Sequence, residues 1–148
     1  MGQISSLLPP ENVILDLEAI SKKTVFEHAS LVFENNQGIA RSAVFDSLFA
    51  REKLGSTGLG RGIAIPHGRI KGLEEAKSAF IRLATPVPFD SPDGKPAVIM
   101  YFLLVPEEAT EQHLQMLSNL TERFSDNTFR DSLLKAKSAE IICQLFNP

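Results

Sequence analysis

Apolar residues alternate with polar ones in some parts of the chain and recur at helical spacing in others, so the sequence predicts both strands and helices. Val13, Leu15 and Leu17 alternate and predict a short strand over 12–17. The near-continuous apolar run at 97–105 is typical of a central strand that is covered on both faces. Two further apolar runs predict strands at 63–65 and 78–83.

Residues at helical spacing, together with capping signals, predict the helices. Ser21 has the side chain of an N-cap, and Gly38 can adopt the left-handed conformation that ends a helix. Thr110 is expected to cap a later helix in the same way as Ser21. The expected helices cover residues 22–37, 42–53, 111–124, 126 or 127 to 135, and 139–145.

The order of these elements predicts the fold class. Strands and helices alternate irregularly, and the loop expected at 86–96, with its four prolines, lies between two strands of the same core. We therefore expect an α/β fold in which residues 1–148 form a single three-layer domain, with a mixed β-sheet flanked by helices on both faces. The length of 148 residues agrees, because single domains most often contain about 100–150 residues.

Composition and charge exclude several classes of function. The chain has 15 Lys and Arg against 18 Asp and Glu, and this net charge of −3 argues against a nucleic-acid partner. No apolar stretch approaches the ~18 residues of a membrane span, and no secretory signal opens the chain. The single cysteine excludes an internal disulfide, so a cytoplasmic location is expected. Residues 1–6 fit an N-myristoylation pattern, but the basic patch that stable anchoring needs does not follow them.

Candidate chemistry concentrates in the glycine-rich segment 54–68 and the arginines around it. Clustered glycines indicate tight turns, and backbone N–H groups exposed in such turns bind anions. The hydroxyls of Ser56 and Thr57 are further donors for an anion. Forked guanidinium donors are available from Arg51, Arg61 and Arg69. The segment lacks the Gly-Lys-Ser/Thr end of a P-loop, so ATP binding is not expected.

His67 stands at the end of this segment, between Pro66 and Gly68. An imidazole has a pKa of about 6.5 and is a good nucleophile near neutral pH. It can attack phosphorus, hold the phosphoryl group and later release it. Phosphoryl transfer mainly requires alignment and stabilisation of negative charge, which an arginine and several N–H donors would supply. The alternative interpretation is a surface or turn histidine without a function.

The segment from Arg51 to Gly68 resembles the active-site region of the phosphotransferase-system IIA components of the mannitol/fructose type. The family pattern is an acidic or amide residue, six further residues, and then Leu-Gly-x-x-Ile-Ala-Ile-Pro-His-Gly; Glu52 and residues 59–68 fit every position. The Gly-Ser-Thr-Gly sequence at 55–58 is similar to the nitrogen-related regulatory branch. The resemblance covers nearly the whole chain and implies the mannitol-type IIA fold, a mixed sheet flanked by helices.

The same resemblance implies the roles of particular residues. His67 would be the phosphorylated residue, Arg51 would stabilise the phosphoryl charge, and His113 would be the second histidine beside the site. Phosphoryl-binding roles would fall to Ser56, Thr57 and Gly68. No metal, nucleotide or other cofactor is expected, because a phosphorylated donor protein is already activated.

The resemblance also implies partners. The protein would accept its phosphoryl group from an HPr-type phosphocarrier, as a phosphotransferase component with a covalent phosphohistidine intermediate. It would act as a regulatory, nitrogen-related IIA component whose protein targets, such as ion-transport subunits or sensor kinases, respond to phosphorylation.

Three other functions remain open at this point. A sugar-specific fructose or mannitol IIA component would pass the phosphoryl group to a IIB domain. A non-catalytic regulator would bind transporters or sensor kinases without transferring phosphate. A metal site that uses His67 and His113 is the third, although the sequence offers no third ligand at a familiar spacing.

Overall fold

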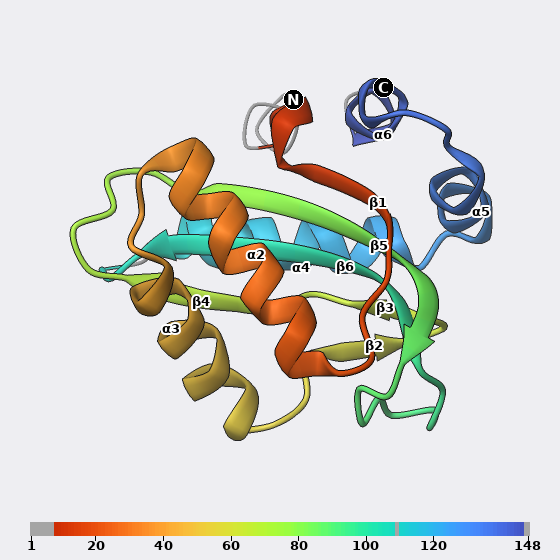
Figure 1. Ribbon diagram of the computed structural model, residues 1–148, viewed down its shortest axis with the longest axis horizontal. Coiled ribbons are helices and arrows are strands. Elements are labelled where there is room, and N and C mark those ends of the chain that lie inside the picture. The colour runs from red at the N-terminus through yellow and green to blue at the C-terminus, as the bar shows by residue number, and fades with distance from the viewer. Residues whose placement is uncertain (1–7, 109, 147–148) are drawn as a thin grey trace.

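The computed structural model describes residues 8–108 and 110–146 (Figure 1). In this part of the chain six β-strands form one mixed sheet, with five α-helices on its two faces. The strands are β1 (Val13–Leu17), β2 (Gly58–Gly60), β3 (Ile63–Ala64), β4 (His67–Ile70), β5 (Lys77–Val87) and β6 (Ala97–Pro106). The helices are α2 (Lys22–Gln37), α3 (Arg41–Lys53), α4 (Glu111–Phe124), α5 (Asn127–Lys135) and α6 (Ala139–Phe146), and a short 3-10 helix, η1 (Pro10–Asn12), precedes β1.

Strand β6 is the centre of the sheet. It pairs antiparallel with β5 along one edge, and parallel with β3 and then β4 along the other. Strand β1 extends the sheet parallel to β5, and β2 extends it antiparallel to β3. The register places His67, the first residue of β4, beside Leu103 of β6. The central strand predicted at 97–105 and the mixed sheet are therefore confirmed.

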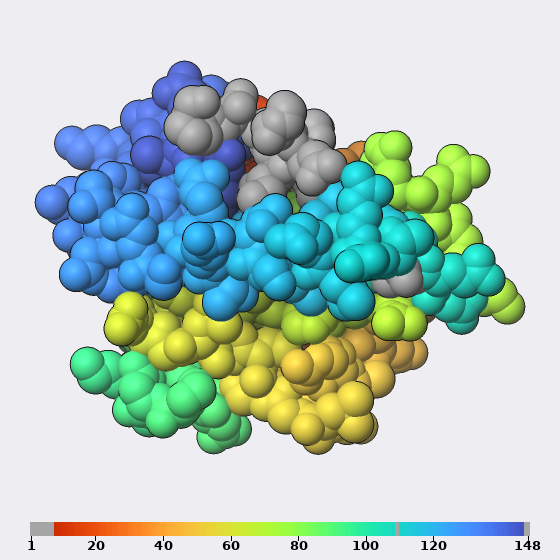
Figure 2. Space-filling view, turned by 180° about the vertical axis from the view of Figure 1, so that it is seen from behind, coloured from red at the N-terminus to blue at the C-terminus, as the bar shows by residue number. Residues whose placement is uncertain are grey.

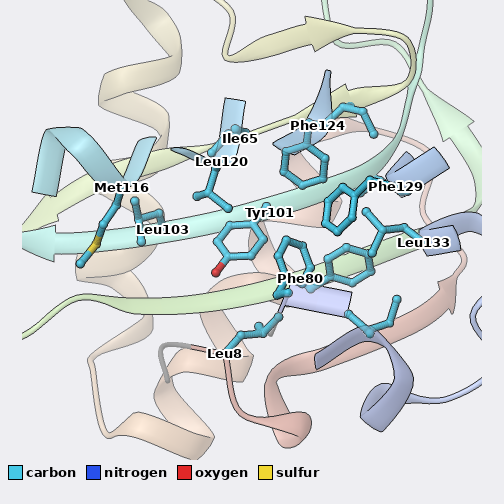
Figure 3. Packing of buried hydrophobic residues seen from close by; sticks show 14 of the residues in the cluster. Leu8, Ile65, Phe80, Tyr101, Leu103, Met116, Leu120, Phe124, Phe129 and Leu133 are labelled. Atoms are coloured by element: carbon cyan, nitrogen blue, oxygen red, sulfur yellow. The ribbon is translucent and has the colours of Figure 1, made fainter. Parts of the chain in front are cut away.

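Alternate residues of β6 enter two apolar cores, one on each face of the sheet. The odd-numbered residues from 99 to 105 join the core beneath α4, α5 and α6, which is rich in aromatic rings (Figure 3). In this core the ring centroids of Tyr101 and Phe146 lie 5.2 Å apart. The even-numbered residues from 100 to 104 join the core beneath α2 and α3. Helices thus cover both faces, and the predicted three-layer α/β architecture is confirmed.

The predicted helix ends agree closely with the structure. Ser21 Oγ accepts a hydrogen bond from the Thr24 N–H at 3.2 Å and begins α2, and Gly38 ends it with a φ of 69°. The other four helices lie within one residue of their predicted bounds. Capping residues can be recognised locally, because the groups that Ser21 and Gly38 contact are only three or four residues away.

The strand predictions are less complete, because strands depend on distant partners. The pattern misses β2, which consists of Gly58, Leu59 and Gly60 and therefore shows no apolar alternation. It also misses β4, whose four residues are held by their pairing with β6. Strand β5 runs beyond the predicted 78–83, because its pairing with β6 resumes at Val87 and Ala97. The loop predicted from residue 86 consequently begins after Val87.

Two observations concern membranes. Within the described residues, no helix is both long enough and apolar enough to cross a bilayer. The N-myristoylation pattern at 1–6 lies outside the described residues.

Candidate functional site

A hollow of about 350 Å³ opens where the second half of α3, the start of β4 and the first turns of α4 meet. Four of the six site residues predicted from the sequence line it: Arg51, His67, Gly68 and His113. The other lining residues are Ser47, Ala50, Leu54, Arg69, Leu103, Val105, Leu114 and Leu117. Figure 2 shows this side of the molecule, with α4 across the middle and the glycine-rich segment with the end of α3 beneath it. Side chains that are far apart in the sequence therefore share one surface depression.

One ring nitrogen of His67, which lines this hollow, is bonded to the backbone. Its Nδ1 lies 2.8 Å from the carbonyl oxygen of Ile65. A carbonyl oxygen can only accept, so Nδ1 carries the hydrogen and the lone pair of the neutral ring is on Nε2. This arrangement leaves a nucleophilic Nε2.

The surroundings of His67 favour the neutral ring. Burial lowers the pKa of His67 below its ordinary 6.5, and the positive charge of Arg51 lowers it further. The hydrogen bond to Ile65 and the negative charge of Glu52 act in the opposite direction, but the net shift of the pKa is downward. At pH 7 the ring is therefore mostly uncharged, as a nucleophile must be.

His113 has the opposite tautomer. It occupies the third position of α4, and its Nδ1 accepts a hydrogen bond from the Thr110 N–H at 3.0 Å. Because a backbone N–H can only donate, Nδ1 of His113 carries no hydrogen, and in the neutral ring the hydrogen is on Nε2. His113 thus takes the position that Glu or Gln usually occupies in a capping box. Its Nε2–H remains available as a donor.

Positive charge reaches the hollow from two arginines. Arg51, in the last turn of α3, donates from Nη1 to the Gly55 carbonyl at 2.8 Å, which leaves other guanidinium hydrogens for an anion. Arg69 of β4 lines the hollow too. Arg61 does not: it lies in the turn between β2 and β3, where its N–H donates to Asp93 Oδ2 at 2.8 Å.

Gly68 is needed where β4 passes closest to α3. A Cβ on this residue would overlap Ser47 Oγ and lie 3.2 Å from the backbone carbonyl carbon of Ser47. The side chain of Ser47 is itself held by a 2.8 Å hydrogen bond to the Arg69 carbonyl. The absence of a side chain at Gly68 therefore sets the distance between the element that carries His67 and the one that carries Arg51.

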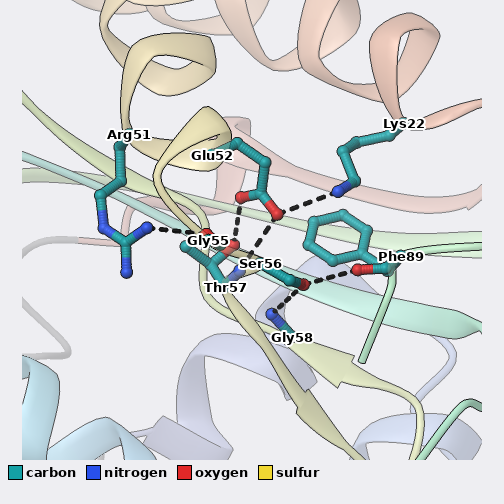
Figure 4. Close-up of polar contacts among 8 residues, drawn as sticks. All are labelled: Lys22, Arg51, Glu52, Gly55, Ser56, Thr57, Gly58 and Phe89. Atoms are coloured by element: carbon teal, nitrogen blue, oxygen red, sulfur yellow. Dashed lines mark hydrogen bonds and ion pairs between the residues drawn. The ribbon is translucent and has the colours of Figure 1, made fainter. Parts of the chain in front are cut away.

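Ser56 and Thr57 are not among the residues that line the hollow, and their polar contacts are drawn in Figure 4. Ser56 Oγ donates to the Phe89 carbonyl at 2.5 Å and accepts from the Gly58 N–H at 3.0 Å. Thr57 is buried, and its hydroxyl donates to Glu52 Oε1 at 2.6 Å. Both hydroxyls thus hold the turn in shape, and their predicted phosphoryl-binding role stays a prediction.

The sequence interpretation does not single out a buried ion pair behind this turn. Glu52 Oε2 lies 2.9 Å from Lys22 Nζ, and the Glu52 side chain is only 5% exposed. The ammonium of Lys22 also lies 4.2 Å from the centre of the Phe89 ring. The family pattern has an acidic or amide residue at the position of Glu52. This position is the one signal in the sequence that could have pointed to the pair of Lys22 and Glu52.

The two histidines do not belong to a metal cluster in the described part of the chain. Within residues 8–108 and 110–146, no group of three or more His, Cys, Asp or Glu side chains is arranged to hold a metal ion.

Comparisons of the sequence with known proteins give one consistent result. The sequence profile described as "Phosphoenolpyruvate-dependent sugar phosphotransferase system, EIIA 2" matches residues 6–148. The chain is 40% identical over 146 residues to a nitrogen regulatory protein of Pseudomonas aeruginosa, and the match covers 98% of this chain and 95% of that relative.

Solved structures give the same result. The crystal structure of nitrogen regulatory protein IIA-Ntr from Neisseria meningitidis matches with a TM-score of 0.92 and 50% identity, over 96% of this chain and 97% of the other. A complex of enzyme IIA-Mtl and phosphorylated enzyme IIB-Mtl from Escherichia coli contains a match with a TM-score of 0.79 and 22% identity, over 95% and 99% of the chains. The second match shows the fold alone. The resemblance predicted from residues 51–68 and the mannitol-type fold are confirmed.

Proposed function

The chain belongs to the EIIA 2 family of the phosphoenolpyruvate-dependent sugar phosphotransferase system, and from this premise we propose that it is a regulatory phosphorelay protein that accepts a phosphoryl group on Nε2 of His67. One observation supports the choice of atom above all others. The hydrogen bond from Nδ1 to the Ile65 carbonyl leaves the lone pair of the neutral ring on Nε2.

The donor is a phosphohistidine of an HPr-type phosphocarrier. The lone pair on Nε2 of His67 attacks phosphorus in line, and a new N–P bond forms. The N–P bond to the donor breaks, and its electron pair returns to the donor imidazole. No free phosphate, metal or nucleotide takes part in this step, because the phosphoryl group moves between two nitrogens of similar character.

Two groups of the hollow can stabilise the charge that is shared over the phosphoryl oxygens. The Nε2–H of His113 is a neutral donor, and the guanidinium of Arg51 is a charged one. The missing side chain of Gly68 lets β4 lie close to α3, so that His67 and Arg51 line one hollow. Donors that are already in place before the reaction stabilise the transition state without reorganisation.

The surface around the hollow suits a protein donor. Leu54 and Leu114 line it while being 85% and 56% exposed, so apolar side chains are available for contact. Arg51 and Arg69 line the same hollow and add positive charge to it. A partner with an apolar patch around its phosphohistidine would cover the leucines, and the arginines would meet the phosphoryl group.

Regulation follows from the change of charge. A phosphoryl group adds about −1.5 to −2 charges at neutral pH, at one place on the surface. Cytoplasmic targets such as ion-transport subunits or sensor kinases that contact this surface would distinguish the two forms. Transfer and regulated binding are therefore two uses of the same site.

The test is phosphorylation of the purified protein by phosphoenolpyruvate, the first enzyme of the relay and an HPr-type phosphocarrier. We expect one acid-labile label per chain, which is lost in His67→Ala and retained in His28→Ala, because His28 of α2 does not line the hollow. Label that persists in His67→Ala would contradict the assignment.

Partner recovery separates the regulatory function from its alternatives. Pull-down of a sensor kinase or transporter subunit with each form should show a clear preference for one of them. Equal recovery with both forms would argue against regulation by phosphorylation. Rapid transfer of the label to a fructose- or mannitol-type IIB domain would favour the sugar-specific function instead.

A further inference from the structure

A continuous set of hydrogen bonds leads from the buried ion pair to the ring of His67. Its first part is centred on Glu52, whose two carboxylate oxygens have separate partners (Figure 4). Oε2 accepts from Lys22 Nζ at 2.9 Å and from the Thr57 N–H at 3.0 Å, and Oε1 accepts from the Thr57 hydroxyl at 2.6 Å. Thr57 is thus fixed at both its backbone and its side chain.

The second part leads from Thr57 to the reactive ring. The Thr57 carbonyl accepts a hydrogen bond from the Ile65 N–H at 3.1 Å, across the β2–β3 hairpin. The carbonyl of Ile65 in turn accepts the hydrogen bond from Nδ1 of His67 at 2.8 Å. Ile65 is therefore held at its N–H by Thr57 and holds His67 at its carbonyl.

We propose that Glu52 is a positioning residue that fixes the ring tautomer of His67 through Thr57 and Ile65. The carboxylate does not touch the hollow or the reacting atoms; it acts by holding the carbonyl to which Nδ1 must donate. If the Ile65 carbonyl moves away, the ring hydrogen of His67 can shift from Nδ1 to Nε2. Nε2 then has no lone pair with which to attack phosphorus. The effect on phosphoryl transfer rests on the function proposed above, but the effect on the tautomer does not.

The placement of Glu52 suits this role better than simple stabilisation of the fold. The Lys22 and Glu52 side chains are 19% and 5% exposed, and an ion pair so far removed from water gains little net stability. Its geometry, however, ties α2, α3 and the 54–58 turn together at one point. Such a pair is well suited to hold a loop in a single position.

The ring tautomer can be measured directly, without any phosphoryl donor. Nitrogen-15 NMR of the histidine side chains distinguishes a protonated from an unprotonated ring nitrogen, and in the native protein we expect the His67 signals to show hydrogen on Nδ1 and none on Nε2. In Glu52→Gln we expect the two nitrogen signals to move toward each other, because both tautomers become populated. Phosphorylation of this variant should slow by about tenfold.

A second pair of variants separates geometry from charge. Thr57→Val removes the hydroxyl bonded to Glu52 but keeps every charge, whereas Thr57→Ser keeps the hydroxyl. We expect the tautomer mixture in Thr57→Val and near-native signals in Thr57→Ser. The charged and titratable groups around His67, namely Arg51, Glu52, Arg69 and His113, are unchanged in both variants. This pair also remains informative if Glu52→Gln folds poorly.

The matched control is Glu34→Gln. Glu34 also pairs with a cation, with its Oε1 3.0 Å from Arg41 Nε, and accepts the Arg41 N–H at 3.0 Å, but it lies away from the hollow. This variant should leave the His67 signals and the rate unchanged. Native tautomer signals in both Glu52→Gln and Thr57→Val would overturn the proposal. If Glu52→Gln shows the mixed tautomer but His67 of the native chain takes no label, the positioning role is supported and the phosphorelay is refuted.

Discussion

His67 and His113 line the same hollow, and each ring is bonded to the backbone through Nδ1, but in opposite hydrogen-bond directions. Nδ1 of His67 donates to the Ile65 carbonyl, whereas Nδ1 of His113 accepts from the Thr110 N–H. The first ring therefore offers a lone pair on Nε2, and the second offers a hydrogen on Nε2. One histidine is prepared to attack an electrophile and the other to donate to an oxygen, without a change in the charge of either.

The donor role of His113 can be separated from its structural role by His113→Gln. Glutamine at the third helical position preserves the capping box of Thr110, so α4 should stay folded. It does not preserve the ring hydrogen on Nε2. We expect phosphorylation by the phosphocarrier to slow by about 100-fold, as for the loss of one preorganised donor, measured by rapid-quench labelling. His28→Gln is the control, and an unchanged rate in His113→Gln would refute the donor role.

Arg51 should affect the site through both its charge and its forked shape. Arg51→Gln removes a positive charge that lowers the pKa of His67, so this pKa should rise, and transfer should slow by about 100-fold. Arg51→Lys keeps the charge, so the pKa of His67 should stay near its native value, yet the loss of the planar fork should still slow transfer. NMR titration of His67 and labelling rates measure the two effects.

Arg41→Gln is the comparison for Arg51, because Arg41 pairs with Glu34 away from the hollow. It should change neither the pKa of His67 nor the labelling rate. If Arg51→Lys transferred phosphate at the native rate, charge alone would explain the role of Arg51, and the forked geometry would not matter.

The sequence predicts the helices well but does not show which groups the hydroxyls of the turn beside the site contact, and the reason is physical. The caps at Ser21 and Gly38 act on groups two to four residues away, so their effect can be recognised locally. The hydroxyl of Thr57 resembles an anion donor in the sequence, but in the fold it donates to Glu52. The direction of the Thr57 hydroxyl is decided only by the packing of the 54–58 turn against α3.

The candidate site, too, could be predicted where the signal is local in the sequence and not where it depends on packing. The long motif that ends in His67 and Gly68 identifies the reactive region. The residues alone offer Arg51 only as one of three arginines that could bind an anion; its specific role, and His113 as part of the site, come from the resemblance. No spacing rule brings His113 to the hollow, because it depends on β4 pairing beside Leu103 and on α4 lying over that edge. The bond from Nδ1 to the Ile65 carbonyl depends on the conformation of three consecutive residues, which periodicity does not determine.

Burial of His67 should also make folding stability depend on pH. The pKa of the native ring lies below the 6.5 of the unfolded chain, so between these two values the unfolded state binds more protons. The contribution of His67 is therefore fully present above pH 6.5 and is lost as the pH falls through the native pKa. In His67→Gln, which cannot titrate, this acid-side loss should be absent.

Urea unfolding between pH 7.5 and pH 5 measures this effect. The difference in the free energy of unfolding between the native chain and His67→Gln should shift in favour of the variant as the pH falls. The same measurement on His28→Gln is the control for loss of a histidine that does not line the hollow. A constant difference across this range would show that the pKa of His67 is the same in both states.

Gly68 provides a test of how the spacing between α3 and β4 determines the reaction. A methyl group at this position would overlap Ser47 Oγ, which is held by its bond to the Arg69 carbonyl, and would crowd the Ser47 backbone at 3.2 Å. Gly68→Ala should therefore lower the free energy of unfolding by about 1–3 kcal/mol, the usual cost of overpacking. Gly68→Ala should also slow phosphorylation. To relieve the overlap α3 must move away from β4, and this movement increases the distance between Arg51 and His67.

The double variant Gly68→Ala with Ser47→Ala shows whether this contact is the cause. Removing Oγ relieves the more severe of the two overlaps, so the double variant should lose less stability than the two single variants together. The backbone contact remains, so recovery should be partial, and phosphorylation should recover to a similar extent. Strictly additive losses of stability would place the cost of Gly68→Ala in the backbone of β4 rather than in its contact with Ser47, and the spacing of the two elements would then not be set at this point.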